Sequence, residues 1–140
     1  MASNFQQLGI RKDLVKGLSE LSIQTPTEIQ VEAIPLLLNR NVELIAKAQT
    51  GTGKTAAYGL PLLQHIDAKN KVVQGLILCP TRELGQQIAK QLFKFTKHTD
   101  KIFAEAVYGG EKIERQTRSG DDGKRFVPQR SRTAIPFEPH

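Results

Sequence analysis

Phosphate chemistry is the first function that the residue types and spacing of this chain indicate. The relevant stretch, called the phosphate loop below, consists of eight consecutive residues: Ala48, Gln49, Thr50, Gly51, Thr52, Gly53, Lys54 and Thr55. Gly51 and Gly53 let the backbone curl until successive N–H groups point into one concavity that attracts phosphate oxygens. Lys54 supplies a cation for the outer phosphates of a nucleotide, and the Thr55 hydroxyl can ligate Mg²⁺. The run predicts a nucleotide site, although Ala48 stands where the usual pattern has Gly.

The segments on either side of the phosphate loop are those that such a site needs. The apolar stretch 42–47 before it predicts a buried strand, and Thr55 to Ile66 after it predicts a helix with a bend at Pro61. A helix that begins at the loop adds its positive N-terminal end and its unpaired N–H donors. The alternative is a Gly-rich loop without a ligand, and the strand–loop–helix order argues against it.

Two helices are expected before the phosphate loop. The first follows Asp13 and has leucines at helical spacing, namely Leu14, Leu18 and Leu21. The second starts at a cap on Thr25, with Pro26 in the first helical position and Glu28 completing a capping box. Pro35 should kink or restart this second helix, because it lacks an N–H donor and crowds the preceding turn.

Further strands and helices alternate after the phosphate loop. Residues 75–79 form an apolar run without alternation, which suits a strand covered on both faces, and 102–108 is a third strand candidate. A helix capped by Thr81 lies between them, with apolar residues that repeat along one face: Leu84, Ile88, Leu92 and Phe95. Another helix begins at 111–116. This order predicts an α/β fold with a parallel sheet and a ligand at the carboxyl ends of its strands.

Composition describes one globular domain. The chain has 140 residues, of which 39 % are hydrophobic and 24 % charged, and its net charge of +6 permits nucleic-acid binding without demonstrating it. Cys79 is the only cysteine, so no intrachain disulfide can form, and it is expected to be a buried small side chain. Neither a signal pattern nor an apolar run long enough for a bilayer occurs, so the expected location is cytoplasmic.

The character of the chain changes after Gln116. Residues 117–140 contain scattered arginines, glycines and prolines, with no helical or alternating period. Few sizeable apolar side chains occur there, so this tail is expected to be disordered, with a plain solvated tail favoured over a polyanion contact. We therefore expect one partial domain over 1–116 and an unrelated tail over 117–140.

Four short motifs make Phe5 to Gln116 resemble the first half of the nucleotide-binding domain of DEAD-box RNA helicases. The family's Q motif appears within residues 3–31, as the run 24–30 with Phe5 upstream, although Ser22 stands where Gly is usual. The phosphate loop is the second motif, and Ala48 in first place is normal in this family. The third is the run 80–84, followed by Gly85 where Ala is commoner, and the fourth is the run 108–110. The resemblance implies an incomplete RecA-like domain, is closest to bacterial members, and covers about four-fifths of the chain.

The resemblance implies roles that the chemistry of these residues supports. Phe5 would stack on adenine, and the Gln30 amide would pair with the adenine amino group and ring nitrogen, which would select ATP over GTP. The residues of the phosphate loop would hold the phosphates of ATP, with Mg²⁺ on Thr55. Contacts to the RNA sugar-phosphate backbone, independent of base sequence, would come from a further group: Pro80, Thr81, Arg82, Gly109 and Gly110.

The family's remaining motifs do not occur in these residues. The sequence has no Asp-Glu-Ala-Asp or Ser-Ala-Thr run, and Asp121 and Asp122 lie in a polar, Gly-flanked stretch rather than after a buried strand. His65, His98 and His140 are too dispersed for a metal site. Two hypotheses stay open: part of an ATP-dependent RNA helicase, or an inactive remnant that binds nucleotide or RNA. The missing strands also predict marginal stability and aggregation.

Overall fold

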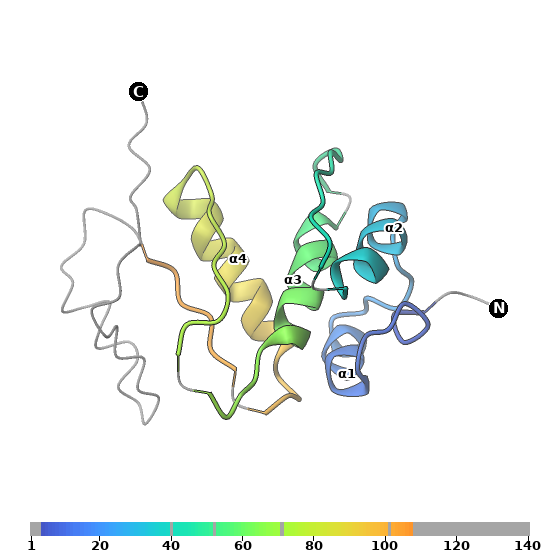
Figure 1. The fold of residues 1–140 in the computed structure, drawn as a ribbon, viewed down its shortest axis with the longest axis horizontal. Helices are drawn as coiled ribbons and strands as arrows, with labels where there is room; N and C mark the ends of the chain where they lie inside the picture. The colour runs from blue at the N-terminus through green and yellow to red at the C-terminus, as the bar shows by residue number, and fades with distance from the viewer. Residues whose placement is uncertain (1–3, 40, 52, 71, 101, 108–140) are drawn as a thin grey trace.

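Four α-helices account for the regular structure of the part of the chain described by this computed structural model, residues 4–39, 41–51, 53–70, 72–100 and 102–107. They are α1 (Lys12–Glu20), α2 (Glu28–Leu37), α3 (Lys54–His65) and α4 (Arg82–Phe95). Figure 1 shows α3 in the middle, with α4 on one side and α1 and α2 on the other. All four lie where the sequence predicted helices. None of the helices in these described ranges is long and apolar enough to cross a bilayer.

Helix α2 begins two residues later than the sequence predicted. Its N-cap is Thr27 rather than Thr25, and the capping box joins Thr27 to Gln30 rather than Thr25 to Glu28. Both pairs have the spacing that a capping box requires, so local sequence does not separate them. The second pair is used because Gln30 also reaches a partner on another segment, the Gly53 carbonyl oxygen.

Pro35 and Pro61 lie inside continuous helices. Pro35 is in the last turn of α2, where it removes only its own N–H donor, and Leu38 N still donates to the Ile34 carbonyl oxygen at 3.0 Å. The sequence predicted a kink or a restart at Pro35; the continuous helix excludes the restart, and the kink stays a prediction. Pro61 is buried within α3, which runs on to His65.

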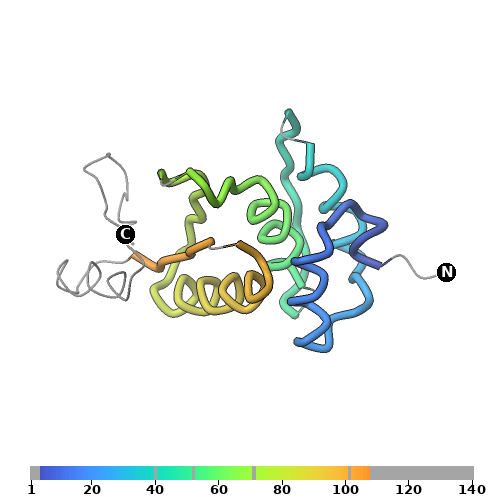
Figure 2. The backbone as a smooth tube through the Cα atoms, turned by 90° about the horizontal axis from the view of Figure 1, so that it is seen from below, coloured from blue at the N-terminus to red at the C-terminus, as the bar shows by residue number. Residues whose placement is uncertain are grey.

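The cap predicted for α4 is confirmed, since Thr81 Oγ1 accepts a hydrogen bond from Leu84 N at 3.2 Å. Three of the four residues expected on its apolar face are buried, namely Ile88, Leu92 and Phe95. Leu84, in the first turn, remains 38 % exposed. Helix α4 contacts α3 and α1, and Figure 2 shows the three helices beside one another from a second direction.

The three predicted strands form no hydrogen-bonded ladder within the described residues. Figures 1 and 2 place 42–49 and 73–79 on opposite flanks of α3, so the two segments are not neighbours. A cleft of about 490 Å³, lined mostly by apolar side chains, lies between α3, α4 and 76–80, with Leu37 of α2 at its wall. The parallel sheet thus stays a prediction.

The run 75–79 is not covered on both faces, contrary to expectation. Ile77 and Cys79 pack against the hydrophobic core, whereas Leu76 and Leu78 are 62 % and 76 % exposed. The segment 102–107 alternates in the same way, with Phe103 and Val107 exposed. Both segments have the period of a strand and lack a cover on the outer face.

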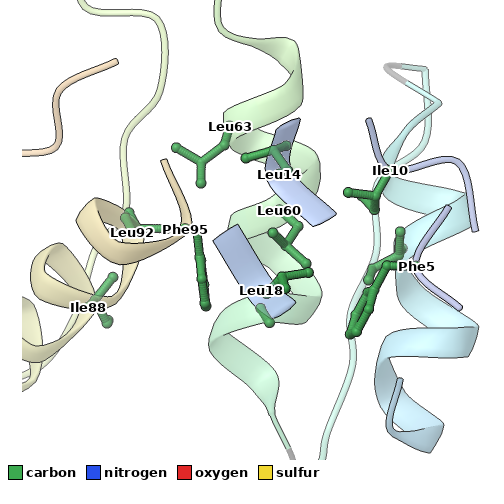
Figure 3. Packing of buried hydrophobic residues seen from close by; sticks show 11 residues of the cluster. Phe5, Ile10, Leu14, Leu18, Leu60, Leu63, Ile88, Leu92 and Phe95 are labelled. Atoms are coloured by element: carbon green, nitrogen blue, oxygen red, sulfur yellow. The ribbon is translucent and has the colours of Figure 1, made fainter. Parts of the chain in front are cut away.

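One core joins the helices to the N-terminal residues. Its buried members include Phe5, Ile10, Leu14, Leu18, Ile34, Leu60, Leu63, Ile88, Leu92 and Phe95. Figure 3 shows side chains from α1, α3 and α4 meeting around Leu60, with Phe5 and Ile10 on the other side of α3. The core thereby holds α3, which begins at the phosphate loop, from both sides.

A polar cluster ties the C-terminal ends of α1 and α4. Glu20 Oε1 lies 2.6 Å from His98 Nε2, and Glu20 Oε2 lies 3.3 Å from Lys97 Nζ. The hydrogen bond from His98 and then that from Lys97 hold the pKa of Glu20 below its ordinary value of 4.5. This cluster lies on the surface and has no part in the candidate site.

Candidate functional site

The phosphate loop has the backbone conformation that a phosphate cradle needs. Gly51 and Gly53 have φ angles of 78° and 80°, in the left-handed region that favours glycine. Open space surrounds Gly51, so its requirement is conformational only. Gly53 has a second requirement, because a Cβ atom there would collide with the Gln30 amide nitrogen. Thr52 lies outside the described residues.

The N-terminal end of α3 offers an electropositive site for an anion. Gly53 is its N-cap, Lys54 is its first residue and is exposed, and Thr55 follows half-buried. The first turn of α3 carries no acidic residue, so no negative side chain there offsets the charge of Lys54 or the positive end of the helix dipole. The N–H groups of the first helical turn, a flexible ammonium and a hydroxyl therefore lie close together, which suits the phosphates of a nucleotide and their Mg²⁺. This chemistry fits Thr55 as a ligand through its hydroxyl.

Gln30 joins α2 to the phosphate loop. Its side chain is 3 % exposed, its Nε2 donates to the Gly53 carbonyl oxygen at 3.0 Å, and its Oε1 accepts from Thr27 N at 3.0 Å. One amide thus serves as helix cap and as a tie between two segments 23 residues apart. Sequence reasoning missed this tie and the part of Thr27. The Thr27-x-x-Gln30 spacing was the signal that could have pointed to them. The adenine contact of Gln30 stays a prediction.

Phe5 lies inside the core rather than at an open surface. Its side chain is 1 % exposed and belongs to the same cluster as Ile34 of α2 and Ala56 of α3. Stacking on adenine would require the ring to turn out of this position. That role stays a prediction, and the structure adds a packing role that the sequence did not indicate.

The residues predicted to touch RNA begin α4. Thr81 is the N-cap and Arg82 the first residue, and both are exposed, as is Pro80. Figure 1 shows α3 and α4 side by side with their N-terminal ends toward the same edge of the molecule. The phosphate loop and Thr81–Arg82 therefore face one edge. Gly109 and Gly110 lie outside the described residues, so their position relative to Arg82 stays untested.

No group of three His, Cys, Asp or Glu residues within the described ranges is placed to hold a metal ion. His65 Nε2 lies 3.0 Å from the Leu37 carbonyl oxygen and His98 contacts Glu20. Cys79 is half-buried, with its Sγ 3.7 Å from the Thr81 carbonyl oxygen. His140, Asp121 and Asp122 fall outside the described residues.

Comparison with known proteins gives one consistent result. A family model described as DEAD/DEAH box helicase matches residues 27–128. This match continues past Gln116, and the predicted boundary there stays untested. The RNA helicase CrhR of Synechocystis is 46 % identical over 127 residues, which are 91 % of this chain and 25 % of CrhR.

Solved structures agree with the family match. A DEAD box protein from the hyperthermophile Methanococcus jannaschii is similar with a TM-score of 0.75 and 32 % identity, over 83 % of this chain and 31 % of that one. S. cerevisiae Dbp5, in a structure bound to RNA and ADP BeF3, is similar with a TM-score of 0.68 and 37 % identity, over 71 % of this chain and 26 % of that one. The chain thus spans about a quarter of the curated relatives that it matches.

Proposed function

Because this chain belongs to the DEAD/DEAH box helicase family, we propose that it is the nucleotide-binding portion of an ATP-dependent RNA helicase and that it binds ATP with Mg²⁺. The proposal rests on three features found together. The loop has glycines in the left-handed region, the N-terminus of α3 has no acidic residue to offset its positive dipole, and Gln30 bonds the Gly53 carbonyl oxygen. A loop that only connected a strand to a helix would need none of the three.

Each group of the site has a distinct task in this proposal. The backbone of 48–53 holds the phosphates, Lys54 neutralises the outer ones, and Thr55 ligates Mg²⁺ through its hydroxyl. Mg²⁺, when bound, screens the charge of the phosphate oxygens. Gln30 reads the adenine edge with its amide, which offers both a donor and an acceptor. ATP is thereby preferred over GTP.

RNA is the second proposed ligand, at the edge where α4 begins. Thr81 and Arg82 contact the sugar-phosphate backbone, with Pro80 shaping the junction and Gly109 and Gly110 adding backbone N–H donors. The similar Dbp5 structure holds RNA, which supports this assignment. Such contacts position a strand without reading its sequence.

The 140 residues by themselves are proposed to bind ATP without hydrolysing it. No Asp-Glu-Ala-Asp run is present to hold Mg²⁺ and position the attacking water, and no Ser-Ala-Thr run follows. The same observation favours the second candidate function, a remnant that binds nucleotide or RNA and has no catalytic role.

Lys54→Ala tests the nucleotide proposal, with the exposed Lys90→Ala on α4 as the matched charge control. Isothermal titration should show ATP·Mg²⁺ binding to the native chain and to Lys90→Ala, and binding about 10–100-fold weaker to Lys54→Ala, since a charge-assisted contact is lost. An RNA-stimulated ATPase assay should show no turnover. Equal affinity of all three proteins for ATP would refute the site, and turnover that Lys54→Ala abolishes would refute the proposed inactivity.

A further inference from the structure

Gln64, on α3, makes two long-range hydrogen bonds that no motif predicted. Its Nε2 donates to the Gly9 carbonyl oxygen at 2.8 Å, and its Oε1 accepts from Arg11 N at 2.9 Å. The amide pairs with this backbone as another peptide group would, so it holds both the position and the direction of the chain. Contacts across more than 50 residues join the N-terminal segment to the helix that starts at the phosphate loop.

The N-terminal arm, residues 4–11, is the segment that Gln64 holds. It folds on itself, because Ile10 N donates to the Phe5 carbonyl oxygen and Gly9 N to the Gln6 carbonyl oxygen, both at 3.0 Å. Gly9 has a φ of 102°, and a Cβ there would lie 2.8 Å from Leu38 Cδ1, just beyond α2. The arm is thus pinned against α3 by Gln64 and against α2 by close packing.

Phe5 is the arm residue that lies between α2 and α3. The ring is 1 % exposed and shares a cluster with Ile34 of α2 and Ala56 of α3, which lies two residues after Lys54. Figure 3 shows Phe5 and Ile10 together between these two helices. The ring therefore helps to set the spacing between the helix that carries Gln30 and the helix that begins at the phosphate loop.

We propose that Gln64 is a positioning residue for recognition of the nucleobase. By holding the arm, it keeps Phe5 between α2 and α3 and so keeps the Gln30 amide in register with the phosphate loop. Gln64 lies ten residues from Lys54 along α3, about 15 Å away, so it acts on the phosphate groups neither by contact nor by charge. This inference rests on the proposed ATP site.

Loss of Gln64 should weaken binding of the nucleobase more than binding of the phosphates. Within the described residues the arm forms no hydrogen bond with Lys54 or Thr55, so binding of inorganic tripolyphosphate with Mg²⁺ should weaken less than binding of ATP. Binding of ATP should weaken about five- to tenfold, the size expected from one or two hydrogen bonds, and the preference for ATP over GTP should shrink. The ratio of the two Kd values is informative because a lower folded fraction weakens both ligands equally.

The experiment is isothermal titration of the 140-residue chain with ATP, GTP and tripolyphosphate, each with Mg²⁺. The variants are Gln64→Ala, Gln64→Met, which keeps the length of the side chain and loses both hydrogen bonds, and Gln87→Ala, an exposed control on α4. Gln64→Ala and Gln64→Met should lower the ratio of ATP to tripolyphosphate affinity, whereas Gln87→Ala should not.

Each other outcome counts against a different statement. If ATP and tripolyphosphate weaken equally in both Gln64 variants, Gln64 only stabilises the fold and the inference is wrong. If Gln64→Met behaves as the native chain does, the hydrogen bonds have no role in recognition. If the native chain binds tripolyphosphate and shows no preference for ATP, the base contact in the proposed function fails first, and if it binds neither, the whole proposed site fails.

Discussion

Gln30 has two structural roles in this site. Its amide caps α2 through Thr27 and bonds the Gly53 carbonyl oxygen, and it is buried with both oxygen and nitrogen engaged. A buried amide without partners would cost about 1–3 kcal/mol, so these bonds keep the side chain in one orientation. The Nε2 atom keeps a second N–H and the Oε1 atom a second lone pair, and the proposed adenine contact would use these.

Ser22 has a backbone conformation that is unfavourable for a residue with a Cβ atom. It has a φ of 59° and follows α1 in a Schellman motif, in which Ile23 N donates to the Leu18 carbonyl oxygen and Ser22 N to that of Ser19, both at 3.0 Å. Glycine is usual at this position, because a Cβ atom is strained there. We expect Ser22→Gly to raise the free energy of unfolding by about 0.5–1 kcal/mol in urea denaturation.

Ser22→Ala is the control for that experiment. Alanine keeps the strained Cβ atom and removes only an exposed hydroxyl, so it should give no gain. A gain of equal size with alanine would mean that the hydroxyl rather than the backbone was responsible.

Among the elements, the close crossing of α1 and α4 depends on glycine at position 17, which has no side chain. A Cβ on Gly17 would lie 2.5 Å from the Phe95 carbonyl oxygen, which is backbone and cannot turn aside. The two helices would have to separate, so Gly17→Ala should lower the free energy of unfolding by about 1–3 kcal/mol, measured by thermal or urea denaturation.

The matched substitution is Gly85→Ala in α4. A Cβ there would lie 3.1 Å from Cys79 Sγ, the end of a side chain that can shift by a small amount. Helix propensity favours alanine by about 0.5–1 kcal/mol, so this variant should be neutral or more stable. Equal losses at both positions would contradict the distinction between a fixed oxygen and a movable sulfur.

For the whole molecule, the decisive feature is the bare outer face of the segments expected to be strands. Ile45 is fully exposed, and Leu76, Leu78 and Val107 are each more than half exposed. Apolar side chains on an extended segment without a neighbour favour association with other chains. The predicted tendency to aggregate has a structural basis in these residues.

Two neighbouring substitutions test this feature. Leu78→Lys should reduce light scattering of the concentrated chain and change the free energy of unfolding by less than about 0.5 kcal/mol, because residue 78 faces outward. Ile77→Lys should cost about 2 kcal/mol or more, because residue 77 packs against the core. If both variants unfold alike, the assignment of inner and outer faces is wrong. Uniform hydrogen-exchange protection of 42–49, 73–79 and 102–107 would argue against marginal stability.

Local sequence determined the helices and the phosphate loop. Apolar periodicity, a capping signal and the strand–loop–helix order located all four helices, Thr81 was identified as a cap, and Gly51 and Gly53 occur where left-handed backbone is needed. These features depend on neighbours along the chain, which a single sequence contains. The motifs also identified the family that the comparisons then showed.

Only the tertiary structure decided which of several locally equal partners is used. Thr25 and Thr27 both have the sequence spacing of a capping box, and the contact between Gln30 and Gly53 selects Thr27. Gln64 has no local signal, since its partners are more than 50 residues away. Strand pairing belongs to the same class, because a ladder needs a neighbour in space, and none joins the described segments. The phosphate loop could therefore be predicted from the sequence, whereas the long-range contacts of Gln30 and Gln64 that hold it in place could be identified only from the tertiary structure.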